Sequence, residues 1–168
     1  MSKIRRITVS VGFVLLLSAY GWSQASQTAS ANPTGFDRLK TLVGKWESKS
    51  PEGVVNISYR LVSGGSALME TIKMPGEEMI TMYHRDGNAV VMTHYCTENN
   101  QPRMRAVPSS SNELKFDLVD VSNLSSPDAG HMRGLTMIFE DANHLTSRWT
   151  YRSGGKDQVF EFKATRKS

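Results

Sequence analysis

Residues 79 to 96, MITMYHRDGNAVVMTHYC, bring together side chains that could carry out acid–base, nucleophilic or metal chemistry. They include His84, His94 and the single cysteine of the chain, Cys96. An imidazole close to a thiol is the pair from which a cysteine nucleophile is built, and two imidazoles can share a metal ion. The Asp86-Gly87 step predicts a tight hairpin turn between two strands.

The register of this hairpin decides which side chains could act together. A two-residue turn at Asp86-Gly87 puts His84 on one face and both His94 and Cys96 on the other. The two histidines are then about 17 Å apart along the strands. A three-residue turn that includes Asn88 would bring both to one face, still far apart. Either turn excludes a metal site made by the hairpin alone, and no metal site is predicted.

Cys96 and His94 share a face in the two-residue register, but a cysteine nucleophile also needs a third, orienting group. The neighbouring sequence supplies none, and the chain has no Gly-x-Ser-x-Gly elbow. We therefore expect Cys96 to pack as a core side chain. His94 is the one candidate for acid–base catalysis, and this role requires a carboxylate or an arginine within reach of its imidazole.

The first 25 residues have the layout of a secretory signal peptide. A basic start, MSKIRR, precedes the apolar run ITVSVGFVLLLSAY and the small-residue end GWSQA. A retained membrane anchor is the alternative, but a span needs about 20 apolar residues. We therefore predict that residues 1–25 are a signal peptide, that the mature protein is exported without a membrane span, and that residues 26–34, SQTASANPT, are a flexible linker.

Removal of the signal peptide changes the charge of the chain. The formal net charge is +4, but Lys3, Arg5 and Arg6 lie in residues 1–25, which contain no acidic residue. The mature chain therefore carries +1, which argues against the clustered basic surface of a nucleic-acid-binding protein. About 143 residues remain, enough for one domain with its own core, which we place at residues 35–168.

A residue period of two dominates this domain. After a short helical pattern in GFDRLKTLVGKW, apolar and polar side chains alternate in VVNISYRLV, ELKFDLVD, LTSRWTYR and VFEFKATR. Turn signals such as Pro75-Gly76 and Gly154-Gly155 separate the alternating runs. The pattern predicts an all-β fold, an up-and-down antiparallel β-barrel of about 8–10 strands with a short N-terminal helix.

This layout resembles that of the lipocalin-like (calycin) β-barrels, and among them the nitrobindin-like domains. The resemblance covers nearly the whole mature chain in layout, but in motif it rests on Gly44, Trp46 and Arg166. In that group the tryptophan of a Gly-x-Trp motif plugs one end of the barrel and stacks with an arginine of the last strand. The resemblance thus implies a plug made by these three residues, while Trp46 as an ordinary core residue is the alternative.

Some nitrobindin-like domains hold haem through a histidine near the C-terminus. No histidine follows His144 in this chain, so the haem ligand of those domains has no counterpart here. We therefore expect no haem or other cofactor.

Methionines and tyrosines are frequent in the barrel region, where they either line an adaptable pocket or fill a core. Arg103 and Arg105 share a strand face, which either points inward toward acidic partners or an anionic ligand, or is solvated. Our interpretation is a barrel that binds a small, mostly apolar ligand with a polar or acidic end. The residues predicted to contact the ligand are Tyr59, Met69, Met82, Met92, His94, Tyr95 and Arg105.

Two other functions stay open at this point. An enzyme on the same barrel would use His94 as an acid or a base. A structural or interaction module would have a solid interior and apolar surface on its outside. An interior cavity of about 300 Å³ or more would distinguish the ligand-binding barrel from the solid one.

Overall fold

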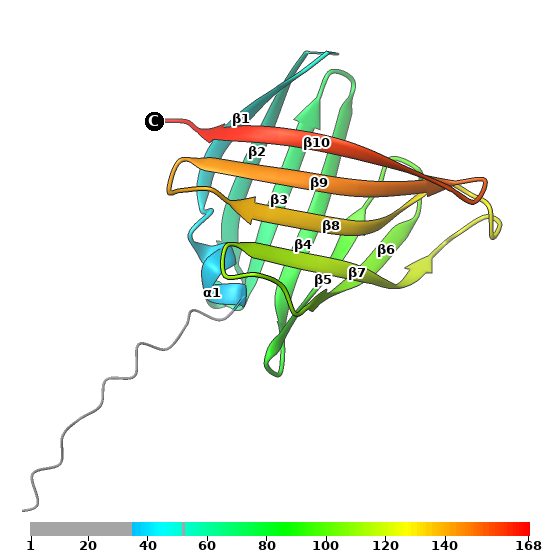
Figure 1. The fold of residues 1–168 in the computed structure, drawn as a ribbon, viewed down its shortest axis with the longest axis horizontal. Coiled ribbons are helices and arrows are strands. Elements are labelled where there is room, and N and C mark those ends of the chain that lie inside the picture. The colour runs from blue at the N-terminus through cyan, green and yellow to red at the C-terminus, as the bar shows by residue number, and fades with distance from the viewer. Residues whose placement is uncertain (1–34, 52) are drawn as a thin grey trace, which may run out of the picture. The chain divides into compact units, whose positions relative to one another are not determined.

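The computed structural model describes residues 35–51 and 53–168. The predicted signal peptide (residues 1–25) and linker (residues 26–34) lie outside the described residues. In the described part of the chain, ten antiparallel strands close into an up-and-down barrel that is preceded by one short helix (Figure 1). This architecture confirms the fold class predicted from the alternation of apolar and polar residues.

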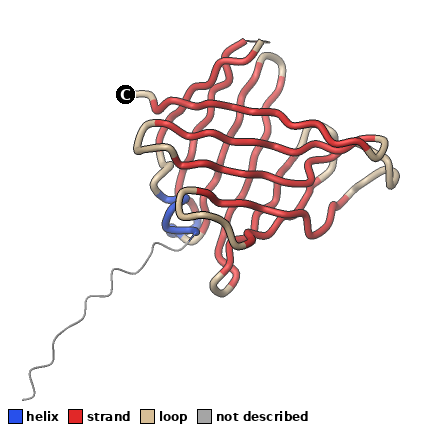
Figure 2. The backbone as a smooth tube through the Cα atoms, viewed as in Figure 1, coloured by secondary structure: helices blue, strands red, loops and turns tan. Residues whose placement is uncertain are grey.

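The strands pair in chain order, and the first also pairs with the last, which closes the barrel (Figure 2). The closing pair is short and joins Trp46, Glu47 and Ser48 of the first strand to Arg166, Thr165 and Ala164 of the last. The elements are α1 (Gly35–Lys40), β1 (Gly44–Ser50), β2 (Gly53–Val62), the 3₁₀ turn η1 (Ser63–Gly65), β3 (Ala67–Met74), β4 (Glu77–Asp86), β5 (Ala89–Tyr95), β6 (Gln101–Val107), β7 (Glu113–Ser122), β8 (His131–Phe139), β9 (His144–Ser153) and β10 (Lys156–Arg166).

Strand β2 shows how the sequence separates the inside of the barrel from the outside. Val55, Ile57 and Tyr59 are buried, whereas Asn56 and Arg60 are exposed. Successive side chains of a strand point to opposite faces of the sheet, so a period of two in the sequence becomes a two-sided wall. The buried set fills much of the interior and forms the core.

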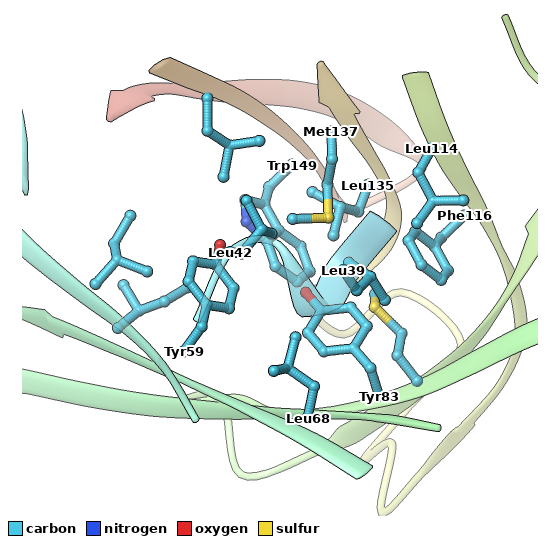
Figure 3. Packing of buried hydrophobic residues seen from close by; sticks show 14 of the residues in the cluster. Leu39, Leu42, Tyr59, Leu68, Tyr83, Leu114, Phe116, Leu135, Met137 and Trp149 are labelled. Atoms are coloured by element: carbon cyan, nitrogen blue, oxygen red, sulfur yellow. The ribbon is translucent and has the colours of Figure 1, made fainter. Parts of the chain in front are cut away.

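The helix α1 lies at one end of the barrel (Figure 1) and buries Phe36 and Leu39. No helix in the described residues is long and apolar enough to span a lipid bilayer. Figure 3 shows Leu39 and Leu42, from the start of the domain, beside side chains of several strands in the interior. This end of the barrel is therefore filled by side chains.

Trp46 and Arg166 meet at the same end of the barrel. The two residues are directly opposite each other in the β1–β10 pair, and Trp46 is buried. The indole Nε1 donates a hydrogen bond to the carbonyl oxygen of Leu42 at 2.8 Å. The guanidinium carbon of Arg166 lies 4.3 Å from the centroid of the indole. The contact that the resemblance implied between these two side chains is thus present.

The β4–β5 hairpin turns at Gly87-Asn88, one residue later than the sequence interpretation placed it. Asp86 pairs with Ala89, and Gly87 has a φ of +58°. Asn88, at the second central position, is not among the residues with positive φ, and a positive φ at the first position alone is the geometry of a type II′ turn. The shift leaves each side chain on its predicted face. It places His94 opposite Thr81, three positions from His84 in β4, whereas the predicted turn would place His94 opposite a residue five positions from His84.

Candidate functional site

A cavity of about 570 Å³ opens at the end of the barrel away from α1. Its lining includes Ser50 and Pro51, which follow β1, and the β3–β4 turn residues Met74 and Glu77. Since β1 starts beside α1 at Gly44 and ends at Ser50, these residues mark the opposite end of the barrel. The molecule therefore has one end packed with side chains and one end that is hollow.

The inner wall of the cavity consists of four buried side chains, Ile72, Met79, His94 and Trp149. Three of them are apolar and come from β3, β4 and β9, while His94 comes from β5. The His94 and Trp149 rings are in contact, with centroids 4.7 Å apart and a tilt of 43°. A mostly apolar wall with one polar group is the usual composition of a small-molecule site.

The rim of the cavity is more exposed and more polar. Here the rim means the lining residues outside the inner wall: Ser50, Pro51, Met74, Glu77, Cys96, Thr97, Glu98, Met132, Tyr151, Val159, Phe160, Glu161 and Phe162. The charged residues among the described lining are all acidic, namely Glu77, Glu98 and Glu161. Glu98 accepts a hydrogen bond from the Tyr151 hydroxyl at 2.9 Å, and Glu161 is paired with Arg148 at 2.7 Å.

His94 is held by one hydrogen bond on one side of its ring. Its Nδ1 lies 2.9 Å from the hydroxyl oxygen of Thr81, which is directly opposite it in the β4–β5 pair. Its Nε2 is buried and has no hydrogen-bond partner among the described residues. Burial lowers the pKa of His94 from 6.5 to about 4, so the imidazole is neutral at pH 7. His94 is thus an uncharged polar side chain in the mostly apolar inner wall of the cavity.

Behind His94 lies a buried carboxylate, Glu70, which is 2% exposed. The Tyr59 and Tyr83 hydroxyls donate hydrogen bonds to its two oxygens at 2.7 and 2.8 Å. Burial raises the pKa of Glu70, and the neighbouring Tyr59, Tyr83 and Thr81 side chains act against that rise. Burial, followed by the charge of Glu70, raises the pKa of both tyrosines, so they are hydrogen-bond donors at neutral pH. Figure 3 shows both phenol rings inside the barrel.

Cys96 lines the cavity two residues beyond His94 and is partly buried. Burial is the largest of the effects that raise the pKa of its thiol. A thiol with a raised pKa is protonated at neutral pH and is a poor nucleophile. The expectation of core packing is met in part, because Cys96 packs against the core cluster and also borders the cavity.

The structure divides the residues predicted to contact a ligand into three groups. His94 is the one that lines the cavity. Tyr59 and Met92 are buried inside the barrel but outside the cavity lining, in the network around Glu70 and in the core. The prediction placed the other four in the interior as well, and this is corrected by the structure: Met69, Met82, Tyr95 and Arg105 lie on the outer face.

The sequence pattern itself explains the four misplaced residues. Met69 and Met82 alternate with Glu70 and Thr81, and the polar pair is the one that faces inward. Tyr95 follows the buried His94 and is 49% exposed. Arg105 forms an exposed ion pair with Asp86. The outward, solvated alternative for the two arginines of β6 is therefore the correct one, and Arg103 is paired with Asp120 in the same way.

Sequence reasoning missed most of the inner wall and the carboxylate behind it. Trp149 stood in an alternating run, which was a usable signal for an inward position. Ile72 and Met79 carried no signal beyond being apolar. Sequence reasoning gave Glu70 no place in the site, because an acidic residue in a strand ordinarily faces water.

Metal chemistry has no obvious centre here. In the part of the chain that the structure describes, no three His, Cys, Asp or Glu side chains come together to hold a metal ion.

Comparison with known proteins does not assign this chain to a family. No known family model matches the chain, and no curated protein matches it.

Proposed function

We propose that this protein is an exported, lipocalin-like barrel that carries a small, mostly apolar molecule in the cavity at its open end. The observation that carries the proposal is the cavity itself, about 570 Å³ with an apolar inner wall. This volume lies within the range of about 300 to 1,000 Å³ that is typical of small-molecule sites. A structural module would instead have a solid interior without a cavity of this size.

The packed end of the barrel supports the same function. Trp46 and Arg166 close that end, so a ligand would enter at the rim and stop against the inner wall. Around the indole the interior is filled by core side chains, which support the walls of the cavity. A rigid, preformed site binds with a smaller loss of conformational entropy than a flexible one.

The test is binding of N-phenyl-1-naphthylamine, an uncharged apolar probe whose fluorescence rises in apolar surroundings. We expect saturable binding of one probe per barrel, together with quenching of tryptophan fluorescence, because Trp149 is in the inner wall. Cys96→Phe, which projects a larger side chain into the cavity, should weaken binding by about tenfold or more through lost volume.

The matched control is Thr93→Phe, which places the same new ring on the other face of the sheet. Thr93 alternates with the buried Met92 and His94 in β5 and is paired with Met82 on the outside. This variant should bind the probe as the unmodified protein does. Equal loss of binding in both variants, or no binding by the unmodified protein, would contradict the proposal.

Export is tested separately, by mass spectrometry of the protein recovered from its own host. The proposal expects a chain that starts at Ser26 in the exported fraction. The same sample under native conditions would also show any molecule that is purified with the barrel.

The enzyme alternative is not favoured by the site. It required a carboxylate or an arginine within reach of His94, and the group that contacts its Nδ1 is the Thr81 hydroxyl. Glu70 lies beyond Thr81, which is opposite it in the β3–β4 pair.

A further inference from the structure

Strand β10 is paired along almost its whole length on one side but only at its end on the other. It pairs with β9 from Lys156 to Thr165 without interruption. It pairs with β1 only through Ala164, Thr165 and Arg166. Figure 1 shows β1 and β10 side by side near the end of β10 and apart toward its start. The side of β10 that faces β1 is therefore an open strand edge over residues 157–163.

The direction of the backbone groups shows which residues lack a strand partner at this edge. The amide of Arg166 donates a hydrogen bond to Asn143, just before β9, and the amide of Lys167 donates to Lys45 of β1. Successive residues of an antiparallel strand direct their N–H and C=O groups to opposite neighbours. Every second residue back from Lys167 thus faces away from β9. Within the open edge, these residues are Asp157, Val159, Glu161 and Lys163.

The open edge is accessible to solvent. Six consecutive residues of β10, from Lys156 to Glu161, are exposed. Where a barrel wall is closed, alternate side chains of a strand are covered by the interior. Here two neighbouring apolar side chains, Val159 and Phe160, are 58% and 38% exposed. There is therefore room beside this edge, and apolar surface lies next to it.

The cavity adjoins the same edge. Its lining contains residues 159–162 of β10 together with Ser50 and Pro51 from the end of β1. Continuation of the β1–β10 register would place Pro51 opposite Glu161, but the pairing stops before that point. Proline has no N–H to donate, so β1 is unable to complete the ladder there. The opening between the two strands therefore leads from the open edge into the cavity.

An open strand edge beside an apolar cavity has both features that strand addition requires. An added peptide strand forms main-chain hydrogen bonds with the edge, and its alternate side chains occupy pockets below it. Residues 157–163 would pair with a peptide segment of about the same length. The cavity of about 570 Å³ would hold the apolar side chains on one face of that segment.

The charges of the lining indicate which peptide segments fit. All charged lining residues in the described chain are acidic, and Glu161 is already paired with Arg148. Glu77 and Glu98 form no ion pair with another residue of the described chain. A segment with basic residues would therefore be attracted, whereas an acidic segment would be repelled.

We propose that residues 157–163 of β10 bind an extended segment of another protein, mostly apolar with basic residues, which adds to the barrel as a further strand and places alternate side chains in the cavity. The inference goes beyond the carriage of a small molecule, because it assigns a protein partner to the edge of the sheet. The peptide segment and a small molecule would compete for the same cavity.

Hydrogen exchange of the unmodified protein, followed by NMR, tests the open edge before any peptide is added. We expect fast amide exchange at Val159, Glu161 and Lys163, which face the opening. Phe160 and Phe162 should exchange slowly, because their N–H groups face β9. Slow exchange at Val159 and Glu161 in the monomeric free protein would overturn the inference, since the edge would then be covered already.

The probe for binding is the peptide acetyl-Lys-Val-Thr-Phe-Thr-Val-Lys-amide, which alternates apolar and polar side chains and ends in basic ones. Calorimetry should show one peptide per barrel, and the amides of Val159, Glu161 and Lys163 should become protected. The peptide should also displace N-phenyl-1-naphthylamine, because its apolar side chains enter the cavity. Replacement of both lysines by glutamate should weaken binding by about tenfold.

Two N-methylated forms of this peptide test the geometry of strand addition. One form carries methyl groups on the amides of both threonines, and the other carries them on the amides of both valines. Each form thus loses two donors, on opposite edges of the extended chain. One form should bind about tenfold more weakly than the parent peptide and the other within about twofold of it, because only one edge faces β10. Equal effects of the two modifications would overturn strand addition.

The outcomes separate this inference from the proposed function. Binding of N-phenyl-1-naphthylamine without binding of the peptide would overturn the inference and leave the small-molecule function standing. Binding of the peptide without binding of the probe would support the inference and contradict that function. A concentration-dependent dimer that protects Val159 and Glu161 would assign the edge to a second copy of the chain and would overturn the proposed partner.

Discussion

The guanidinium of Arg166 lies over the indole of Trp46, with its central carbon 4.3 Å from the ring centroid. It also donates hydrogen bonds to the carbonyl oxygens of Thr41, Val43 and Ala142, at 2.6, 2.8 and 2.9 Å. One side chain of the last strand thus connects the segment that follows α1, the β8–β9 turn and the first strand. This contact stabilises the end of the barrel that is filled by the core.

Arg166→Lys should lower the free energy of unfolding by about 2 kcal/mol, although the charge is kept. Lysine cannot supply the planar fork that donates to three carbonyls while it stacks on the indole. Urea unfolding followed by tryptophan fluorescence measures the difference. Arg60→Lys is the control, because Arg60 is exposed and its guanidinium contacts the sulfur of Met69, and it should change stability by less than about 0.5 kcal/mol. Equal effects of the two substitutions would contradict the role of Arg166.

Gly44→Ala should also destabilise the plug. Gly44 has a φ of +136°, and a Cβ atom added there would lie 2.8 Å from Nη1 of Arg166. The backbone strain and the displacement of the guanidinium together should cost about 2 kcal/mol. Gly76→Ala separates the two effects, because Gly76 has a φ of +81° but open space around its Cβ position. It should cost about 1 kcal/mol, from strain alone. A Gly76→Ala loss as large as that of Gly44→Ala would show that the guanidinium contact does not matter.

His94 should make the protein less stable as the pH falls through the range from 6.5 to 4. Burial lowers its pKa to about 4 in the folded state, whereas an unfolded histidine takes up its proton near 6.5. The unfolded state therefore binds more protons in this window, and the shift corresponds to about 3 kcal/mol. His94→Gln should flatten the profile of unfolding free energy against pH over this window. His84→Gln, at an exposed position of β4, should keep the original slope, and a flat profile for the unmodified protein would refute the prediction.

Glu70 should change the stability of the protein with pH in the opposite direction to His94. Burial raises the pKa of its carboxyl group in the folded state, so the stability from this group is complete below the unfolded pKa and is lost as the pH rises through the folded value. Glu70→Gln removes the titration and keeps the size of the side chain. Relative to the unmodified protein, this variant should become more stable as the pH rises above about 4.5. Glu78→Gln, which changes an exposed carboxylate paired with Lys73, should show no such rise. A constant difference between Glu70→Gln and the unmodified protein at all pH values would contradict the prediction.

The sequence alone determined the fold, because strand periodicity is a local property. Alternation in runs such as VVNISYRLV, with turn signals between them, was enough to predict an up-and-down barrel of about 8–10 strands, and the structure confirms it with ten. The sides of the β4–β5 hairpin could also be predicted, since a two-residue turn preserves the pairing parity wherever it starts. The contact between Trp46 and Arg166 came from a resemblance in motif, and the register of β1 with β10 places the two side chains together.

The contents of the cavity were decided by the tertiary structure. A period of two separates two faces of a strand but does not say which one is inside when both contain polar and apolar residues. In β3, Glu70 faces the interior and Met69 faces outward, which is the opposite of the usual preference of each residue type. A buried carboxylate is stable only where hydrogen-bond donors surround it, and here these come from β2 and β4, up to 13 residues away in the chain. The inner wall likewise joins His94 to Trp149, from a strand on another side of the barrel, and closure of the sheet alone brings the two rings into contact.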